Sequence, residues 1–191
     1  MKKIILLHLI LLAFAISTQA QKEIYCEIQT ELGQIKLVLY PEKAPKTVAN
    51  FLSYVRNKSY DGSSFFRVCT PENEADREIQ IQVIQGGDVP EDKMFLPIPI
   101  ETTQITGLKH LKGSVSMARG EPNSARSSFF ICVTDEPELD FGGKRNPDGY
   151  GFAVFGQVTE GMEIVEQIQK GENEQQMLLK PIAINSIRII D

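Results

Sequence analysis

Short segments in which apolar and polar residues alternate recur along the chain, and they constrain its fold more than any other feature. Residues 24–30 and 34–40 both alternate, with a turn at Leu32-Gly33 between them, so they predict a β-hairpin. In 182–190 the alternation slips at Asn185-Ser186, which predicts a β-bulge. Further strands are expected at residues 65–68, 81–84, 114–118, 128–134 and 152–158.

Helical periodicity occurs in two places that are far apart. Val48, Phe51, Leu52 and Val55 follow the i, i+3, i+4, i+7 spacing of an amphipathic helix. Residues 162–170 predict a second helix, with Val165 and Ile168 directed inward. Many strands with two helices favour a closed or nearly closed antiparallel barrel or sandwich over a parallel βαβ sheet. The absence of internal repeats and low-complexity linkers predicts one domain, residues 21–191.

The first twenty residues have the pattern of a secretory signal peptide. Lys2 and Lys3 precede a nearly unbroken apolar run over residues 4–16, and residues 17–20 offer small side chains for cleavage. The run is short for a transmembrane helix, although an uncleaved membrane anchor is the alternative. We therefore expect a protein exported to the periplasm or secreted, with residues 1–20 removed.

Composition excludes several classes of function. Loss of residues 1–20 moves the formal charge from −5 to −7, and no basic patch suggests nucleic acid as a partner. His110 is then the one remaining histidine, which argues against Ser-His-Asp and Cys-His catalysis and against a histidine zinc site. Cys26, Cys69 and Cys132 are odd in number, so at least one is unpaired within the chain, and a Cys26–Cys69 disulfide stays open.

One cation, Arg67, lies inside the apolar strand at 65–68. A charged residue in a half-buried strand needs a partner or a function, unless it faces solvent. An acidic segment, 72–78, follows and is expected to be a solvated loop. A second apolar run, 81–84, then leads into Gln85-Gly86-Gly87-Asp88.

Two other motifs are interpreted as turns and not as ligand sites. Gly86-Gly87 and Gly142-Gly143-Lys144 lack the spacing of a phosphate-binding loop. Asp140, Asn146 and Asp148 do not match an EF-hand and are expected in a polar turn. We expect neither a metal nor a cofactor.

Several sequence blocks follow one another in a fixed order and together span essentially the whole mature chain: 60–68, 83–88, 108–110, 113–118, 127–131, 154–156, Val158 and 161–162. In sequence and in order, these blocks resemble the cyclophilin family of peptidyl-prolyl isomerases.

The resemblance implies a mainly β fold: a closed eight-stranded antiparallel barrel capped by two helices, with a peptide groove on its outer face. It implies catalysis by Arg67, with Gln85 orienting the peptide. Phe51, Phe65, Phe129 and Phe155 are expected in the barrel core. The resemblance places the substrate-binding residues at Phe66, Val83, Ala118, Arg119, Ser128, Phe130, Leu139 and Phe152.

Several positions depart from the family pattern. Phe66 stands where the family has histidine, Arg119 where it has asparagine, and Ser128 where it has glutamine. Gln82 and Val83 replace phenylalanine and methionine, and the tryptophan of many members falls near Glu138. Residues 72–78 belong to an insertion. The proline pocket is therefore expected to be less aromatic, with a more polar rim.

The expected function is isomerisation of X-Pro bonds by a monomer that assists the folding of exported proteins. Its expected partners are proline-containing peptides, unfolded exported proteins, and cyclosporin-like ligands with reduced affinity. The alternative is a binding or chaperone module that holds proline-containing segments with little or no turnover. A barrel that encloses a hydrophobic ligand is the weaker third reading, because the inward positions are filled by Ile, Leu, Val and Phe.

Overall fold

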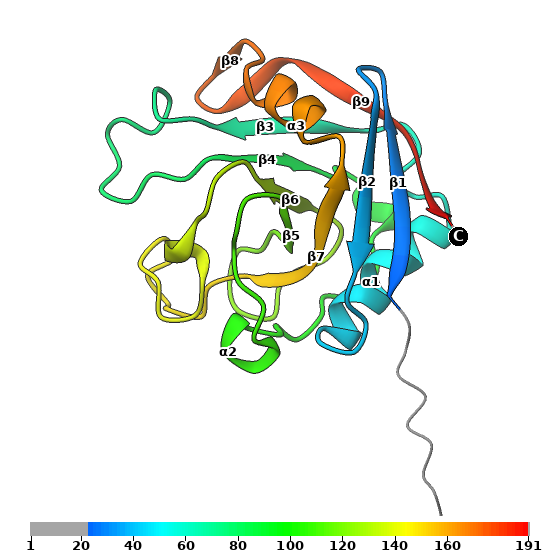
Figure 1. Ribbon diagram of the computed structural model, residues 1–191, viewed down its shortest axis with the longest axis horizontal. Helices are drawn as coiled ribbons and strands as arrows, with labels where there is room; N and C mark the ends of the chain where they lie inside the picture. The colour runs from blue at the N-terminus through cyan, green and yellow to red at the C-terminus, as the bar shows by residue number, and fades with distance from the viewer. Residues whose placement is uncertain (1–22, 191) are drawn as a thin grey trace, which may run out of the picture.

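The computed structural model describes residues 23–190, and the signal segment predicted at 1–20 lies outside these residues (Figure 1). Most of the regular structure is β. The strands are β1 (Ile24–Thr30), β2 (Gln34–Leu39), β3 (Ser63–Cys69), β4 (Val83–Gly86), β5 (Ser114–Met117), β6 (Phe129–Cys132), β7 (Ala153–Glu160), β8 (Asn173–Glu174) and β9 (Met177–Ile190).

The strands form one antiparallel sheet that closes on itself. Their order is β1-β2-β7-β5-β6-β4-β3-β9-β8, and β1 also pairs with β9. Because β8 pairs with β9 alone, eight strands make up the closed barrel. The predicted closed eight-stranded barrel is therefore confirmed, and closure leaves no long unpaired edge.

The bulge predicted in the last strand is present. Gln29 of β1 pairs with Ser186 and Thr30 pairs with Ile184, so Asn185 is the extra residue. The strand itself begins at Met177, earlier than the alternation predicted, because the β8–β9 hairpin precedes it.

Both predicted helices are present, and α1 (Pro45–Arg56) and α3 (Met162–Gln169) lie on different sides of the barrel (Figure 1). Pro45 is in the first turn of α1, where its missing N–H removes no hydrogen bond. A third helix, α2 (Thr103–Thr106), is a single turn, too short to show a period in the sequence. Two 3₁₀ turns, Glu91–Lys93 and Pro137–Leu139, complete the set, and no helix of residues 23–190 could span a bilayer.

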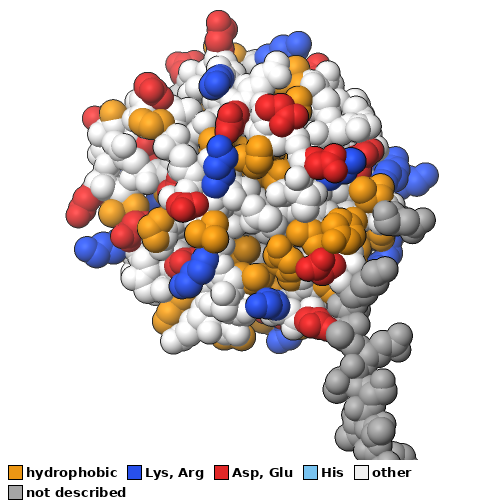
Figure 2. All heavy atoms as spheres, in the orientation of Figure 1, with side chains coloured by type: hydrophobic (Ala, Val, Ile, Leu, Met, Phe, Trp, Pro, Cys, Tyr) orange, Lys and Arg blue, Asp and Glu red, His pale blue; other side chains and the backbone are white. Residues whose placement is uncertain are grey.

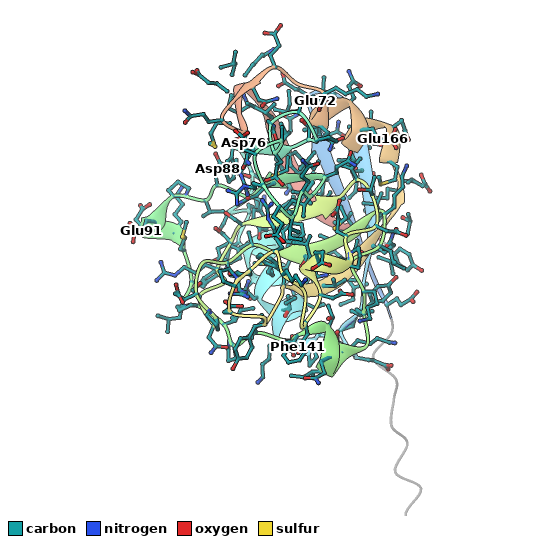
Figure 3. The ribbon with its side chains drawn as sticks, turned by 90° about the vertical axis from the view of Figure 1, so that its left-hand side faces the viewer. Glu72, Asp76, Asp88, Glu91, Phe141 and Glu166 are labelled. Atoms are coloured by element: carbon teal, nitrogen blue, oxygen red, sulfur yellow. The ribbon has the colours of Figure 1, made fainter. Side chains whose placement is uncertain are left out.

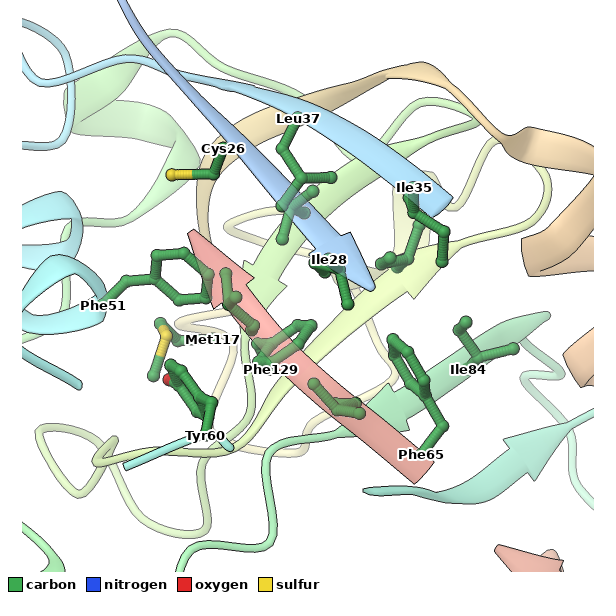
Figure 4. Packing of buried hydrophobic residues seen from close by; sticks show 14 of the residues in the cluster. Cys26, Ile28, Ile35, Leu37, Phe51, Tyr60, Phe65, Ile84, Met117 and Phe129 are labelled. Carbon is green, nitrogen blue, oxygen red and sulfur yellow. The ribbon is translucent and has the colours of Figure 1, made fainter. Parts of the chain in front are cut away.

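Aromatic side chains fill the barrel. Phe51, Phe65, Phe129 and Phe155 are fully buried, as predicted, and Figure 4 shows Phe51 of α1 reaching in beside the strands. Phe51 and Phe129 meet edge to face with ring centroids 5.5 Å apart. This arrangement is the favoured one for aromatic pairs.

A second apolar cluster lies outside the main core. Its members alternate along the strands with core residues, so that on β6 Phe129 points into the barrel and Phe130 points out of it. We call it the outer cluster; it comprises Cys69, Ile81, Val83, Phe130, Cys132 and Leu139, with Ala118 and Phe152 packed against them.

The three cysteines are free and buried, so the Cys26–Cys69 disulfide that the sequence left open is not formed. Cys26 belongs to the main core and Cys69 to the outer cluster. Burial raises the pKa of Cys26 to about 12 and that of Cys69 to about 11. Both are therefore protonated at neutral pH and poor nucleophiles.

The segment between β3 and β4, residues 70–82, projects from the barrel at the left of Figure 1, and Figure 3 looks onto it. Glu72, Asp76 and Glu78 are exposed, as the prediction of a solvated loop requires. For Glu74 the prediction is wrong, because its side chain is fully buried. Arg145 donates to Glu74 Oε2 at 2.7 Å, and the backbone N–H of Ile81 donates to the same oxygen at 2.9 Å.

Burial alone would raise the pKa of Glu74, because a carboxylate loses its hydration there. Hydrogen bonds from Arg145 and Ile81, with the charges of Arg145 and Arg77, outweigh burial and hold the pKa below its ordinary value of 4.5. Glu74 is thus a buried anion that fastens the inserted segment to the turn that carries Arg145.

We expect Arg145→Ala to lower the free energy of unfolding by about 3 kcal/mol, since it leaves a buried carboxylate without its main partner. The Glu74 pKa is depressed in the fold, so this stabilisation is present above pH 4.5 and is lost as the pH falls through the lower folded value. The difference from wild type in urea unfolding should therefore shrink in acid. Lys144→Ala, an exposed neighbour, is the control, and equal stability of both variants at pH 7 would contradict the prediction.

Candidate active site

A β-bulge at Phe66 decides which way Arg67 faces. Phe65 pairs with Gly86 and Arg67 with Gln85, so Phe66 is an extra residue with no partner on β4. In a regular strand Phe65 and Arg67 would share a face. The bulge instead leaves Phe65 in the core and turns Arg67, half-buried, onto the outer surface of the barrel.

Two glutamines hold the guanidinium of Arg67. Nη1 donates to Gln85 Oε1 at 2.7 Å, while Nε and Nη2 donate to Gln176 Oε1 at 3.0 and 2.6 Å. A guanidinium has five N–H groups. One on Nη1 and one on Nη2 therefore have no partner among residues 23–190 and can donate to a ligand.

Arg67 and the outer cluster, apart from Cys69 and Cys132, line one cavity of about 310 Å³. This volume is at the lower end of the range for ligand sites, roughly 300–1,000 Å³, and suits a small apolar group. The floor is apolar, and four arginines stand around it. The lining residues are Arg67, Arg77, Ile81, Val83, Gln85, Ala118, Arg119, Phe130, Leu139, Arg145, Asn146 and Phe152.

The structure brings most of the predicted site residues together. Ser128 lines a neighbouring cavity of about 250 Å³, which shares Gln85, Ala118 and Arg119 with the first. Phe66 lines neither cavity, because it is the bulge residue. The other eight predicted residues line the cavity of about 310 Å³: Arg67, Val83, Gln85, Ala118, Arg119, Phe130, Leu139 and Phe152.

Sequence reasoning missed several lining residues. Arg77 and Arg145 come from segments without regular periodicity, where nothing in the sequence marks a residue as facing a site. Ile81 lies in the apolar run 81–84, which predicts a strand, so the alternation of that strand could have indicated that Ile81 faces the site. A larger hollow of about 650 Å³ lies beside residues 70–73 and 169–173, but none of the residues of the outer cluster lines it.

Contacts at the rim of the cavity hold the side chain of Arg119 in place. It donates to the carbonyl of Gly151 at 2.6 Å, pairs with Asp148 at 2.6 Å, and lies 5.1 Å from the centroid of the Phe152 ring. The hydrogen bond from Arg119 holds the pKa of Asp148 below its ordinary value. Arg119 thus clamps the turn before β7 against Phe152, which forms one wall.

An Asp-His-Ser arrangement lies behind the cavity. His110 Nδ1 is 2.8 Å from Asp140 Oδ1, and Nε2 is 3.0 Å from Ser116 Oγ. Asp140 lies in a turn, as predicted, where its backbone carbonyl accepts from the N–H of Gly143 at 2.9 Å, and all three residues of the arrangement are buried. Burial lowers the pKa of His110. Its ring stacks on that of Phe130, with the ring centroids 5.9 Å apart. The arrangement supports the pocket wall, and no substrate can reach Ser116.

Comparison with known proteins agrees with this geometry. The family model described as "Cyclophilin type peptidyl-prolyl cis-trans isomerase/CLD" matches residues 25–189. Peptidyl-prolyl cis-trans isomerase cyp18 of Streptomyces antibioticus is 38% identical over 172 residues, covering 86% of this chain and 97% of that protein. Peptidyl-prolyl cis-trans isomerase A of Dickeya dadantii is 37% identical over 189 residues, covering 94% and 92%.

Solved structures show the same fold. The crystal structure of a cyclophilin type peptidyl-prolyl cis-trans isomerase from Cryptosporidium parvum superposes with a TM-score of 0.70 at 22% identity, covering 89% of this chain and 99% of that one. Both the sequence and the fold therefore match this family over nearly the whole described chain. The chain belongs to the cyclophilin-type peptidyl-prolyl cis-trans isomerase family.

Proposed function

We propose that the chain accelerates cis–trans rotation of X-Pro bonds, and that its substrates are unfolded proteins exported with it. The observation that carries the proposal is the Arg67 guanidinium. It lines the cavity of about 310 Å³ together with Val83 and Phe130, and two of its N–H groups are not engaged by residues 23–190. The Cryptosporidium parvum isomerase has also been crystallised in the presence of the dipeptide Ala-Pro, with a TM-score of 0.69 to this chain.

The reaction needs electrostatic help at one atom. Rotation about an X-Pro bond meets a barrier of about 18–20 kcal/mol because the C–N bond has partial double-bond character. In the twisted state conjugation is lost and the lone pair localises on the prolyl nitrogen. A hydrogen bond from Arg67 to that nitrogen, or to the amide carbonyl, is then stronger than in either planar state, so it lowers the barrier.

The remaining residues divide the work of binding. Val83, Phe130 and Leu139 form an apolar surface for the proline ring, so that the ring stays in place while the rest of the peptide rotates. Gln85 accepts from Arg67 through its carbonyl oxygen, which leaves its NH₂ group to donate to the peptide. Rotation forms no covalent intermediate and requires neither a metal nor a nucleotide.

The second candidate function is a binding module for proline-containing segments. It is favoured by the altered rim, where Arg119 is tied to Asp148 and a serine, Ser128, replaces the glutamine of the family. The unengaged N–H groups of Arg67 favour the isomerase, because holding an apolar ring needs no cation. Cyclosporin-like ligands should bind with reduced affinity, since the tryptophan that many family members have near the position of Glu138 is absent from this chain.

Export is supported by the N-terminal segment. Two lysines, an apolar run and small residues before Gln21 have the order of a cleavable signal. We therefore propose that the mature chain resides in the periplasm or outside the cell, with a membrane anchor as the alternative.

Replacing Arg67 tests catalysis. We expect Arg67→Ala to lower kcat/KM for an X-Pro peptide by about 100- to 1,000-fold, the usual cost of removing a donor that stabilises the transition state. Arg56→Ala, at an exposed position on α1, should retain wild-type activity. Thermal unfolding should stay cooperative in both. A folded Arg67→Ala protein with the wild-type rate would rule out this role, and an inactive wild type that still binds the peptide would favour the binding module.

Processing tests localisation. Expression of the full chain in Escherichia coli should yield a periplasmic protein that begins at Gln21, because the signal is cleaved after Ala20. Intact-mass spectrometry of the periplasmic and membrane fractions measures this. A membrane-bound product that keeps residues 1–20 would support the anchor instead.

A further inference from the structure

The turn between β8 and β9 carries two residues in an unfavourable backbone conformation. Gln175 and Gln176 have φ angles of 49° and 74°, in the left-handed region. Two-residue hairpin turns of this kind favour Asn followed by Gly, which adopt positive φ most easily. A glutamine at the second position therefore weakens the turn, and the reason for it lies in what its side chain contacts.

Gln176 is held by hydrogen bonds of its backbone and its side chain, two of which come from Arg67. Its backbone carbonyl accepts from the N–H of Val68 at 2.8 Å, beside Arg67 on β3. Its Oε1 accepts from Nε and Nη2 of Arg67 at 3.0 and 2.6 Å. Its Nε2 donates to Glu74 Oε1 at 2.9 Å. A flipped amide would set its NH₂ group against the guanidinium and its oxygen against the carboxylate, so the orientation is determined by its partners.

Glu74 links this amide to the inserted segment. Its side chain is fully buried, and its ion-pair partner, Arg145, has 8% of its side chain exposed. The contacts run from Arg67 through Gln176 and Glu74 to Arg145. The segment at 70–82, which contains the insertion at 72–78, thus reaches the guanidinium through part-buried polar contacts.

We propose that Gln176 and Glu74 are positioning residues for Arg67: they hold its Nε edge, so that the remaining N–H groups of Nη1 and Nη2 are presented to the prolyl peptide. The proposal rests on the isomerase function proposed above. Gln176 accepts hydrogen bonds from Nε and Nη2, and Gln85 accepts one from Nη1. Together they restrict the otherwise flexible side chain of Arg67 to one orientation. Such preorganisation lowers the cost of reaching the transition state.

The proposal predicts an effect on turnover more than on binding. Gln176 is not among the residues that line the cavity, so a change there should leave KM nearly unaltered. An interaction that matters in the transition state alone lowers kcat and kcat/KM together.

Gln176→Asn is the decisive variant. Asparagine is one methylene shorter, so its amide loses the hydrogen bonds to Arg67, yet it tolerates the left-handed conformation better than glutamine. We expect a fall in kcat of about tenfold and a modest loss of thermal stability, because the buried carboxylate of Glu74 loses the donor Gln176 Nε2. Gln175→Asn is the matched control: its side chain is exposed and makes no hydrogen bond within residues 23–190, so its kcat should stay at the wild-type value.

A double variant separates positioning from a general effect on the fold. In an Arg67→Ala background, Gln176→Asn should cause no further loss of kcat/KM, because its effect passes through Arg67. The Nε–H signal of Arg67 in ¹H–¹⁵N NMR, assigned by its absence from Arg67→Ala, should exchange faster with water in Gln176→Asn and be unchanged in Gln175→Asn.

The outcomes are distinct. Wild-type kcat in Gln176→Asn, or an equal loss in the Arg67→Ala background, would overturn the positioning role while the isomerase function stands. A wild type without activity would overturn both. An unchanged Nε–H signal in Gln176→Asn would overturn the contact on which the proposal depends.

Discussion

Pairing of β1 with β9 closes the sheet, and the location of the site follows from that closure. A closed barrel of this width is filled by its own side chains, here Phe51, Phe65, Phe129 and Phe155. Among residues 23–190 the inward positions are occupied by packed side chains, which argues against an open barrel that holds a hydrophobic molecule. The candidate site lies instead on the outer surface, where the strands β3, β4 and β6 present every second side chain.

On that surface, one irregularity positions the cation. The bulge at Phe66 changes the phase of β3, so that an arginine two residues after a core phenylalanine comes to lie outside the barrel. A charged group on a long, flexible side chain is of little catalytic use until it is held. Gln85 comes from the neighbouring strand, while Gln176 comes from a turn more than one hundred residues away in sequence. The rigid sheet and an irregular turn thus combine to orient Arg67.

Local pattern was enough to predict much of the fold. Alternation located the hairpin of β1 and β2 and the bulge at Asn185, because both depend on neighbouring residues. Arg67, Gln85, Val83 and Phe130 were found through resemblance to a family, since nothing in their own spacing marks a groove.

Contacts that join distant segments could not be predicted in this way. Glu74, Arg145 and Gln176 lie in stretches without period, and an acidic residue among other acidic residues looks solvated until its partner is known. The Asp140–His110–Ser116 arrangement could not be predicted for the same reason, because its residues meet only in the folded chain.

The alternation of Phe129 and Phe130 on β6 has an evolutionary consequence. Neighbouring residues of one strand belong to two clusters that share little, so a change in one need not disturb the other. Gln82, Arg119 and Ser128, where this chain departs from the family pattern, all lie outside the main core. Substitutions at these half-buried positions can therefore alter the outer surface while the packing inside the barrel stays the same.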